Sequence, residues 1–300
     1  MAKIDIVIVN WNTGALLAKC MQSLAQLPAE EQGLIGVVYV VDNASRDDSF
    51  AQAQAAVAGE SAVHWQFIAS EKNLGFSGGN NLAIQNIPVG SQAPHVLLLN
   101  PDTEVRPGAL RAVLQVLEDK AEVGIVGPKL VNPDGSLQPS VRPFPRFSDF
   151  VAYMLKAGRL VQSRQENAHD YTQAGVVDQV MGAAFLIRNT VREQIGELDD
   201  GFFTLFEEVD YCKRAKEAGF ATYFTPTGLV IHVNATSFIQ LLAYQRTCPW
   251  IQSALHYADK HLPPWQATFL RLLLPFTFIL TIPATLKHMA LKRRNKERVA

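Results

Sequence analysis

The first hundred residues of this 300-residue chain alternate short apolar, β-branched runs with longer helical stretches. Strands that alternate with helices are joined by right-handed crossovers, which set successive strands side by side in the same direction. The alternation therefore predicts an α/β fold built on a mostly parallel sheet. The predicted strands are Lys3–Val9, Gly36–Val41, Val63–Ile68 and His95–Leu99, and the predicted helices are Thr13–Leu27, Arg46–Ala58 and Phe76–Ile87.

Each of these strands ends in polar or small residues. In open α/β sheets, ligands collect beyond the carboxyl ends of the strands, where the loops meet along one edge. The four endings therefore predict a nucleotide site at that edge. They read VNWNTG (9–14), VDNASRDDS (41–49), SEKNLGFSGGNN (70–81) and NPDTE (100–104).

Asn100, Pro101 and Asp102 stop the last of these strands abruptly. Proline and aspartate are ordinary turn residues, so the tripeptide fits a plain turn. It also fits a metal or phosphate site at the end of a strand. The tripeptide alone leaves both interpretations open.

The second half of the chain has a different pattern. A strand, a tight turn at Asn132–Gly135 and a returning strand predict a β-hairpin. A last apolar run contains His232 near its end. The other predicted elements are helices at Ser148–Gln165 and Leu205–Gly219, a buried strand at Val180–Asn189 and the last run at Gly228–Val233.

Composition narrows the class of protein. The chain is 48% hydrophobic and 18% charged, which is enough apolar material for a sizeable core. Its net charge of −1 gives no indication of nucleic-acid binding. The widely spaced Cys20, Cys212 and Cys248 argue against a disulfide framework and a zinc knuckle. With no secretory signal pattern at the N-terminus, we expect a cytoplasmic protein.

Several acids and one histidine suit group transfer from a nucleotide-activated donor. A leaving diphosphate develops negative charge, which a divalent cation held by carboxylate and imidazole groups would neutralise. Asp102 supplies one such ligand and His232 a second. Transfer with inversion also needs a carboxylate that takes the proton from the attacking hydroxyl. Glu207, Glu208 and Asp210 form an acidic cluster at a predicted helix start.

Seven segments, taken in order, resemble glycosyltransferase family 2, particularly its bacterial rhamnosyltransferase-like members. The resemblance covers roughly residues 3 to 237. It implies an A-type glycosyltransferase fold, in which a nucleotide-sugar half (about 1–105) and an acceptor half (about 106–237) share one twisted sheet. The segments are VIVNWN, VDNAS, NLGFSGGNN, LLLNPDTEV, MGAAFLIR, FFTLFEEVDYCKRAKEAG and VIHVNATS.

What the resemblance implies for single residues divides into three groups. The nucleotide-sugar group is Asn10, Asn12, Asp42, Asn73, Gly75, Gly78, Asn80, Asn100 and Asp102. The metal group, for Mn²⁺ or Mg²⁺, is Asp102 and His232. The catalytic group is Glu208 as the base, with Glu207 beside it.

The sequence departs from the family pattern twice. The D-x-D motif reads Asn100-Pro101-Asp102 and so lacks one carboxylate. The Glu-Asp pair reads Glu207-Glu208, whose second side chain is one methylene longer, and a misplacement of about 1 Å can cost ~10²-fold in rate. Neighbouring helical residues point about 100° apart, so the two glutamates cannot face one hydroxyl equally.

Structural roles compete with these assignments. Asp42 could cap the helix that follows it, the glycines could relieve crowding in a tight loop, and His232 could be an ordinary hydrogen-bonded histidine. Acids in a first helical turn are also stabilised by the helix dipole. We assign Asp210 mainly to an ion pair with Arg214, four residues further on.

An apolar segment, Leu272–Leu286, precedes a basic stretch at residues 287–298. At about 1.5 Å per residue it reaches only ~22 Å, less than the ~30 Å of a bilayer core, and Pro275 and Pro283 interrupt it. A tail of residues 238–300 is therefore predicted to associate with the inner face of the cell membrane as a peripheral or monotopic anchor. The alternative is a C-terminal helix hairpin packed on the domain.

Taken together, these patterns predict an inverting, metal-dependent glycosyltransferase. The expected donor is a dTDP- or UDP-linked sugar, best assigned as dTDP-rhamnose, and the expected acceptor is a hydroxyl of a lipid-linked cell-surface glycan. Two other classes stay open: a silent nucleotide-sugar-binding or scaffold protein, and a nucleotidyltransferase. The latter should show a basic glycine-rich loop near the N-terminus, where VNWNTG has no lysine or arginine.

Overall fold

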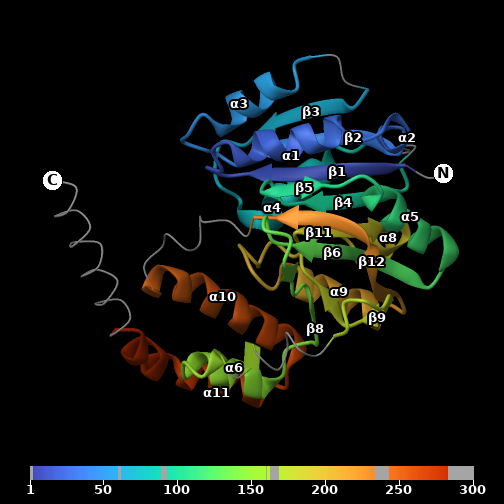
Figure 1. Cartoon of the computed structure of the whole chain (residues 1–300). Helices are drawn as coiled ribbons and strands as arrows, with labels where there is room; N and C mark the ends of the chain where they lie inside the picture. Colours follow the sequence, from blue (N-terminus) through green and yellow to red (C-terminus); the bar gives the residue numbers. More distant parts are fainter. Residues whose placement is uncertain are drawn as a thin grey trace.

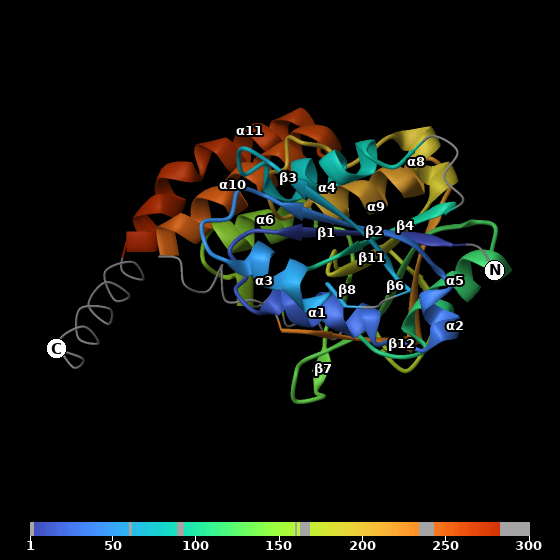
Figure 2. The ribbon, with the colours of Figure 1, turned by 90° about the horizontal axis from the view of Figure 1, so that it is seen from above.

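The computed structural model describes residues 3–59, 62–88, 93–159, 161–162, 169–233 and 243–282. Its centre is a ten-stranded sheet with helices packed on both faces (Figure 1, Figure 2). The strands are β1 (Ile4–Asn10), β2 (Ile35–Asp42), β3 (His64–Ala69), β4 (His95–Leu99), β5 (Thr103–Val105), β6 (Val123–Val131), β7 (Leu137–Gln138), β8 (Val141–Arg142), β9 (Gly175–Val177), β10 (Gln179–Val180), β11 (Ala184–Arg188) and β12 (Ala221–His232). The helices are α1 (Leu16–Ala25), α2 (Ala29–Gln32), α3 (Ser49–Ala56), α4 (Gly75–Gln85), α5 (Ala109–Asp119), α6 (Phe147–Met154), α8 (Asn189–Ile195), α9 (Glu207–Glu217), α10 (Ala243–His261) and α11 (Pro264–Leu272).

The first half of the sheet is parallel, as the alternating pattern predicts. The main path of the sheet runs β3-β2-β1-β4-β11-β6-β12-β5, and the first four strands in this order all point the same way. Asn10 pairs with Asp42, and Asp42 pairs with Ala69, so the polar strand ends lie level with one another. The predicted edge of polar loops is therefore present.

The second half of the sheet is mixed. Strand β11 is antiparallel to both β4 and β6, whereas β12 is parallel to β6. β12 begins at Ala221, earlier than the predicted Gly228, because a register shift between Thr225 and Leu229 lets the strand continue through an irregularity. Its last residue, His232, pairs antiparallel with Thr103 of β5.

Two predicted elements are shorter in the structure than in the sequence analysis. The predicted strand Val180–Asn189 divides into β10, which pairs with β8 in a separate two-stranded sheet, and β11 in the large sheet. The predicted helix Ser148–Gln165 ends at Met154 in α6, because Lys156 adopts a left-handed φ of 61°, a conformation typical of helix ends. Part of that predicted helix lies outside the described residues.

Apolar side chains fill the space on each face of the sheet. Helices α1, α3 and α5 cover one face, and α4, α8 and α9 cover the other (Figure 2). Alternate side chains of β1 point to opposite faces: Ile6 and Ile8 pack in the apolar cluster on one face, and Val7 packs in the cluster on the other. The sheet is therefore buried on both faces, and ligands must reach it from an edge.

A third apolar cluster joins the C-terminal helices to the rest of the molecule. Helices α10 and α11 pack with α6, and Phe150, Tyr257 and Leu270 are buried between them together with Val209 of α9 (Figure 1). The predicted boundary at residue 237 thus separates segments that share a core. The last residues of the predicted tail, 283–300, lie outside the described part of the chain.

A buried carboxylate also connects these helices. Asp210 of α9 is fully buried and lies 2.7 Å from the side-chain nitrogens of Arg214, Lys260 and His261. Burial raises the pKa of Asp210, but the hydrogen bonds from His261 and Lys260 and the charge of Arg214 outweigh it and hold that pKa below its usual range. The expected pair with Arg214 is present, and α10 supplies two further partners.

Asp210→Asn removes the charge and keeps the size of this side chain. We expect the free energy of unfolding at pH 7 to fall by roughly 3 kcal/mol, the lower end of the cost of breaking a buried ion pair. Because the pKa is lowered in the folded state, this stabilisation is lost as pH falls, so the two proteins should converge in stability below about pH 4. Urea unfolding at several pH values measures both effects.

Glu217→Gln is the matched control for this experiment. It makes the same type of change on the same helix but removes only an exposed i,i+4 pair with Lys213, worth about 0.3–0.5 kcal/mol. Equal losses in the two variants would contradict a structural role for the Asp210 cluster.

Candidate active site

One buried amide ties the ends of β1 and β2 together. Nδ2 of Asn10 lies 3.0 Å from Asp42 Oδ1, 3.0 Å from Ser45 Oγ and 2.9 Å from Ser49 Oγ. Asn10 is fully buried, whereas Asp42 is half-buried at the edge of the sheet. Asn10 therefore orients the loop after β2, and Asp42 is the group that a ligand can reach.

Asn12 joins the same loop through its backbone and its side chain. It adopts a left-handed φ of 53°, its N–H donates to Ser45 Oγ at 3.0 Å, and its Oδ1 accepts from the N–H of Arg46 at 2.7 Å. The structure thus brings Asn10, Asn12 and Asp42 together. Their contact with a base and ribose stays a prediction.

The glycine-containing loop is locked to the end of β2 by Asn43. Its Nδ2 donates to Asn73 Oδ1 at 3.1 Å and to the carbonyl of Gly75 at 2.9 Å, and its Oδ1 accepts from the N–H of Leu74 at 2.8 Å. Gly75 has a left-handed φ of 74°, and a Cβ there would collide with the carbonyl oxygen of Phe203. Only glycine fits this position, whatever its contact with a donor.

Gly78 and Asn80 lie on α4, beyond that loop. A Cβ at Gly78 would lie 3.0 Å from the Leu74 Cβ, so this position is close-packed but not blocked. Asn80 is buried, and its amide donates to the carbonyl of Phe76 at 2.8 Å within the helix. Both residues thus border the glycine loop from the helix side.

Asp102 and His232 converge from the ends of separate strands. The pairing of β5 with β12 brings His232 Nε2 to 3.4 Å from Asp102 Oδ1, and both side chains are buried. Nδ2 of Asn100 lies 3.5 Å from the same His232 nitrogen. The two polar residues of the D-x-D-like motif, Asn100 and Asp102, therefore form one cluster with His232.

Gln138 determines which nitrogen of His232 faces Asp102. Its Oε1 lies 2.7 Å from His232 Nδ1, and its Nε2 donates to Asn132 Oδ1 at 3.1 Å, so the glutamine oxygen accepts a proton held on Nδ1. The lone pair on Nε2 then faces the Asp102 carboxylate. Two acceptors at this distance repel each other unless a proton or a cation lies with them.

This donor set fits a divalent cation. Imidazole nitrogen and carboxylate oxygen are accepted ligands of manganese, and a histidine ligand commonly gives its other N–H to an amide or carboxylate oxygen. In the described part of the chain no group of three His, Cys, Asp or Glu side chains could hold an ion. A magnesium ion that also binds substrate phosphates usually takes only one or two carboxylate ligands from the protein, so Asp102 and His232 are compatible with such an ion.

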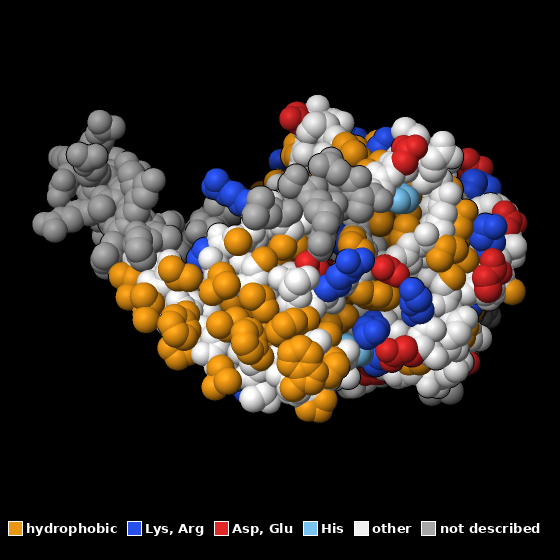
Figure 3. Space-filling view, turned by 90° about the horizontal axis from the view of Figure 1, so that it is seen from below, with side chains coloured by type: hydrophobic (Ala, Val, Ile, Leu, Met, Phe, Trp, Pro, Cys, Tyr) orange, Lys and Arg blue, Asp and Glu red, His pale blue; other side chains and the backbone are white. Residues whose placement is uncertain are grey.

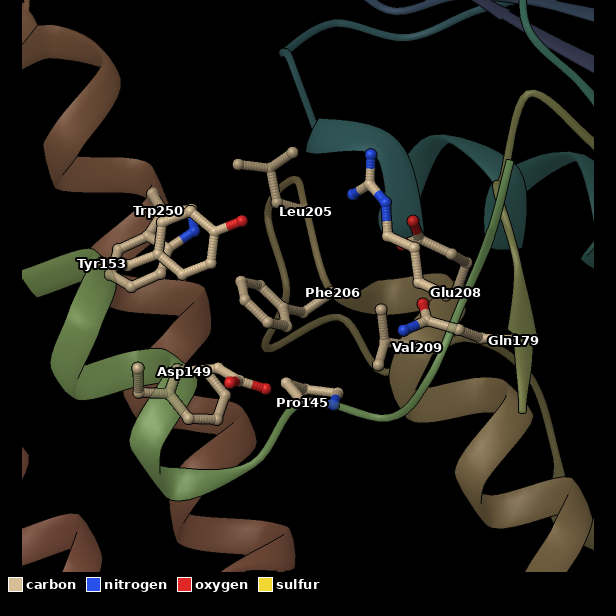
Figure 4. A pocket seen from close by; sticks show the side chains of 11 residues that line it. Pro145, Asp149, Tyr153, Gln179, Leu205, Phe206, Glu208, Val209 and Trp250 are labelled. Carbon is tan, nitrogen blue, oxygen red and sulfur yellow. The ribbon is translucent and has the colours of Figure 1, made fainter. Parts of the chain in front are cut away.

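The two candidate catalytic glutamates follow a strained turn. Leu205 and Phe206 both have a φ of 71°, which is rare for residues with a Cβ and is found mainly at functional sites. Glu207 is buried beneath the start of α9, whereas Glu208 is half-buried and lines a cavity (Figure 4). The register of the turn therefore exposes the second glutamate to a ligand.

The surroundings of the two carboxyl groups raise both pKa values. Burial raises the pKa of Glu207 well above its usual range, and the neighbouring Glu208 raises it further. Burial also raises the pKa of Glu208, while its own backbone N–H and the charge of Arg142 oppose the rise. Both carboxyl groups are thus shifted toward the neutral form, and Glu208, which lines the cavity, is the proton acceptor that a ligand can reach.

Gly182 lies close to both Glu208 and Phe76, which belong to two other segments of the family resemblance. A Cβ at Gly182 would lie 3.6 Å from the Glu208 Cβ and 3.8 Å from Cζ of Phe76. Phe76 in turn donates its N–H to the Phe203 carbonyl at 2.7 Å, next to Gly75. The start of α4, the turn between β10 and β11 that contains Gly182, and the glutamate pair therefore lie close together.

Sequence reasoning missed several residues of this site. Gln138 and Asn43 act through contacts with residues 94 and 30 positions away, respectively, and no local pattern reveals such contacts. The position of Asn43 directly after Asp42 was the available signal for that residue. Arg142 and Trp250 line the cavity beside Glu208, and Trp250 lies beyond the region of resemblance.

Known proteins match this chain over most of its length. The sequence profile of the family described as Glycosyltransferase like family 2 matches residues 2–248. The N-acetylglucosaminyl-diphospho-decaprenol L-rhamnosyltransferase of Mycobacterium tuberculosis is 26% identical over 279 residues, which are 88% of this chain and 87% of that protein. The low-salt glycan biosynthesis hexosyltransferase Agl10 of Haloferax volcanii is 28% identical over 213 residues, 71% of this chain and 61% of that protein.

A solved structure shares the fold. The mannosyltransferase of Pyrobaculum calidifontis in complex with GDP-Man and Mn²⁺ superposes with a TM-score of 0.60 over 96% of this chain and 75% of that chain, at 13% identity. The predicted A-type glycosyltransferase fold is confirmed. From the matched profile, the chain belongs to glycosyltransferase-like family 2 and is a nucleotide-sugar-dependent glycosyltransferase.

Proposed function

We propose that this enzyme transfers rhamnose, with inversion, from dTDP-rhamnose to a hydroxyl of a lipid-linked cell-surface glycan. The observation that carries the proposal is the side chain of Glu208, which lines a cavity and lies close to Gly182, a position that Phe76 of α4 also approaches. The choice of sugar and acceptor is supported by the rhamnosyltransferase of M. tuberculosis, whose name gives an N-acetylglucosaminyl-diphospho-decaprenol acceptor.

In the proposed reaction, Glu208 takes the proton from the acceptor hydroxyl while the oxygen of that hydroxyl attacks the anomeric carbon of the donor. The new carbon–oxygen bond forms as the bond to the nucleoside diphosphate breaks on the opposite side, so the configuration inverts. A general base works best when its pKa lies near the operating pH, and the raised pKa of Glu208 moves it in that direction. A neutral Glu207 keeps a second negative charge away from the base.

Asp102 and His232 are the residues that would hold a divalent cation, Mn²⁺ or Mg²⁺. When bound, such a cation would neutralise charge that develops on the leaving diphosphate. Gln138 holds the imidazole in the tautomer that leaves Nε2 free to bind a metal. Asn100 offers an amide where the family pattern has a second carboxylate.

The proposal also includes a membrane surface at the C-terminal end. In the described part of the chain, the helix Pro264–Ile282 is long and apolar enough to cross a membrane. Its inner residues Ala267 and Leu270 are buried in the core with α6 and α10, so crossing would remove them from that core. We therefore propose that the helix lies in the plane of the inner membrane interface.

The exposed apolar side chains of this helix form an apolar patch. Figure 3 shows hydrophobic side chains gathered on this face of the molecule. An exposed patch of this kind on a soluble domain indicates a partner or a membrane. Its members are Trp265, Phe269, Leu272, Phe276, Phe278, Ile279, Leu280 and Ile282. The basic stretch at 287–298, expected to meet anionic lipids, lies outside the described residues.

Substitution of the base tests the proposed function. Glu208→Gln keeps the size of the side chain and removes the proton acceptor, so rhamnosyl transfer should fall by ~10²–10⁴-fold. Binding of dTDP, measured by thermal shift, should stay the same. Glu207→Gln makes the same change at the neutral neighbour and should cost no more than a few-fold.

Two outcomes would contradict this assignment. If Glu207→Gln were inactive and Glu208→Gln active, the first glutamate would be the base. If the wild-type protein bound nucleotide sugars yet never released nucleoside diphosphate from them, it would be a silent binding protein.

Loss of the Gln138 contact tests the metal assignment. Gln138→Leu removes the acceptor for His232 Nδ1–H, and loss of such a supporting contact typically costs about 10–100-fold in metal affinity. A manganese titration of the thermal shift produced by dTDP measures this loss. Ser136→Ala is the control, because this residue lies on the same hairpin and its hydroxyl bonds to Asp134 and Asn132, so the titration should stay unchanged. Wild-type transfer that persists in strong chelator would exclude the cation.

Polar substitution of the apolar patch tests the membrane surface. Phe276→Ser combined with Ile279→Ser removes two exposed side chains, each worth about 1.5–3 kcal/mol when fully buried, so binding to anionic vesicles should fall at least about tenfold. Leu137→Ser, an exposed apolar residue on β7, is the control and should bind as the wild type does. Co-sedimentation measures both, and equal binding by all three proteins would exclude the patch as the contact.

A further inference from the structure

A cavity of about 180 Å³ lies between α6, α9 and α10, and only Glu208 among its lining residues has a role in the reaction described above. Figure 4 shows that its wall combines residues from segments far apart in the sequence. One side of the cavity is aromatic and the other side is polar. Each side restricts the chemistry of the ligand that fits.

The aromatic side consists of four rings that support one another. The ring centroids of Tyr153 and Trp250 are 5.4 Å apart, those of Phe206 and Trp250 are 6.1 Å apart, and those of Phe150 and Phe206 are 5.7 Å apart. Rings packed in this way are fixed in orientation before a ligand arrives. They offer a preformed apolar surface.

The polar side has hydrogen-bonding capacity that the protein does not use. One carboxylate oxygen of Glu208 is buried without a hydrogen-bond partner. The side chain of Arg142 lines the same wall, and its charge acts on the Glu208 carboxyl. Buried polar groups are nearly always satisfied, so a ligand with hydroxyl groups is expected at this wall.

A sugar ring matches both sides of the cavity. Its C–H groups suit the aromatic wall, and its hydroxyls can donate to Glu208 and accept from Arg142. A hydrocarbon chain would leave the Glu208 oxygen unsatisfied. The volume is below the roughly 300–1,000 Å³ of sites for drug-sized ligands, so the cavity holds one ring rather than an oligosaccharide.

We propose that this cavity binds the terminal sugar ring of the acceptor and presents one of its hydroxyls to Glu208. The proposal rests on the proposed function and adds to it the residues that recognise the acceptor. Trp250 and Tyr153 bind the face of the ring, and Arg142 binds its polar edge. None of these three residues belongs to the nucleotide side of the site.

The position of α6 provides a route for the lipid part of the acceptor. The ring of Phe147, at the start of α6, lies 5.4 Å from the ring of Trp265 and 5.6 Å from that of Phe269, both in the apolar patch. Tyr153, on the same helix, lines the cavity. A short helix therefore separates the sugar site from the membrane surface.

Kinetics with a water-soluble acceptor test this cavity without a membrane. The probe is N-acetylglucosaminyl diphosphate carrying a short alkyl chain, with dTDP-rhamnose as donor and the full chain as enzyme. Trp250→Leu and Tyr153→Leu remove a ring and keep an apolar side chain. We expect each to raise the acceptor KM by about tenfold, with little change in nucleoside diphosphate release without acceptor. Leu155→Ala, exposed at the end of α6, is the control and should keep the wild-type acceptor KM.

Direct binding to the wild-type protein tests the same cavity if a ring variant fails to fold. The probe, added to wild-type protein without donor, should change the tryptophan fluorescence through Trp250. An unchanged acceptor KM in folded Trp250→Leu, or no fluorescence change in the wild type, would overturn the assignment. Failure of the wild type to transfer rhamnose despite a fluorescence change would instead count against the proposed function.

Discussion

The rest of the structure depends on the backbone pairing of β1, which lies between β2 and β4 and is parallel to both. This register puts Asn10 level with Asp42 and brings the loop that begins at Asn100 to the same edge. The three-residue strand β5 then pairs with the end of β12, so Asp102 meets a histidine 130 residues further along the chain. The grouping of these polar side chains at one edge of the sheet is therefore a consequence of strand register. No single loop could bring them together.

The candidate catalytic residues depend instead on a difference in the surroundings of two adjacent glutamates. The same backbone turn buries Glu207 and opens Glu208 to a cavity, and the residues that make this turn, Leu205 and Phe206, adopt a conformation that costs of order 1–3 kcal/mol each. The surrounding core tolerates this strain because Phe206 packs against Phe150 and Trp250. Two chemically identical side chains thereby differ in their access to a ligand, because the backbone turn and not the residue type decides which of them lines the cavity.

Local pattern predicted much of the fold, including the exact span of β4 and the parallel first half of the sheet. Local pattern predicted the bounds of an element less well where contacts with distant segments or single backbone conformations determine them. The extra length of β12 depends on a register shift against β6, and the early end of α6 on one left-handed residue. The pairing of Asp210 with Arg214 follows from helical spacing, whereas its contacts with Lys260 and His261 cross 50 residues. The sequence identified Asp102 and His232 as candidate metal ligands, whereas the contact of Gln138 with His232 is visible only in the structure.

The contact of Lys260 with both Asp199 and Asp210 has a consequence for biosynthesis. A chain leaves the ribosome from its N-terminus, and domains tend to fold in that order. Strands β1 to β4 emerge early, but Asp210, beside the candidate catalytic glutamates, obtains Lys260 and His261 as partners only when α10 has emerged. A nascent chain can thus shape its donor half while the acceptor half is unfinished, and the helix directly after α10, with its apolar patch, appears just as the site becomes complete.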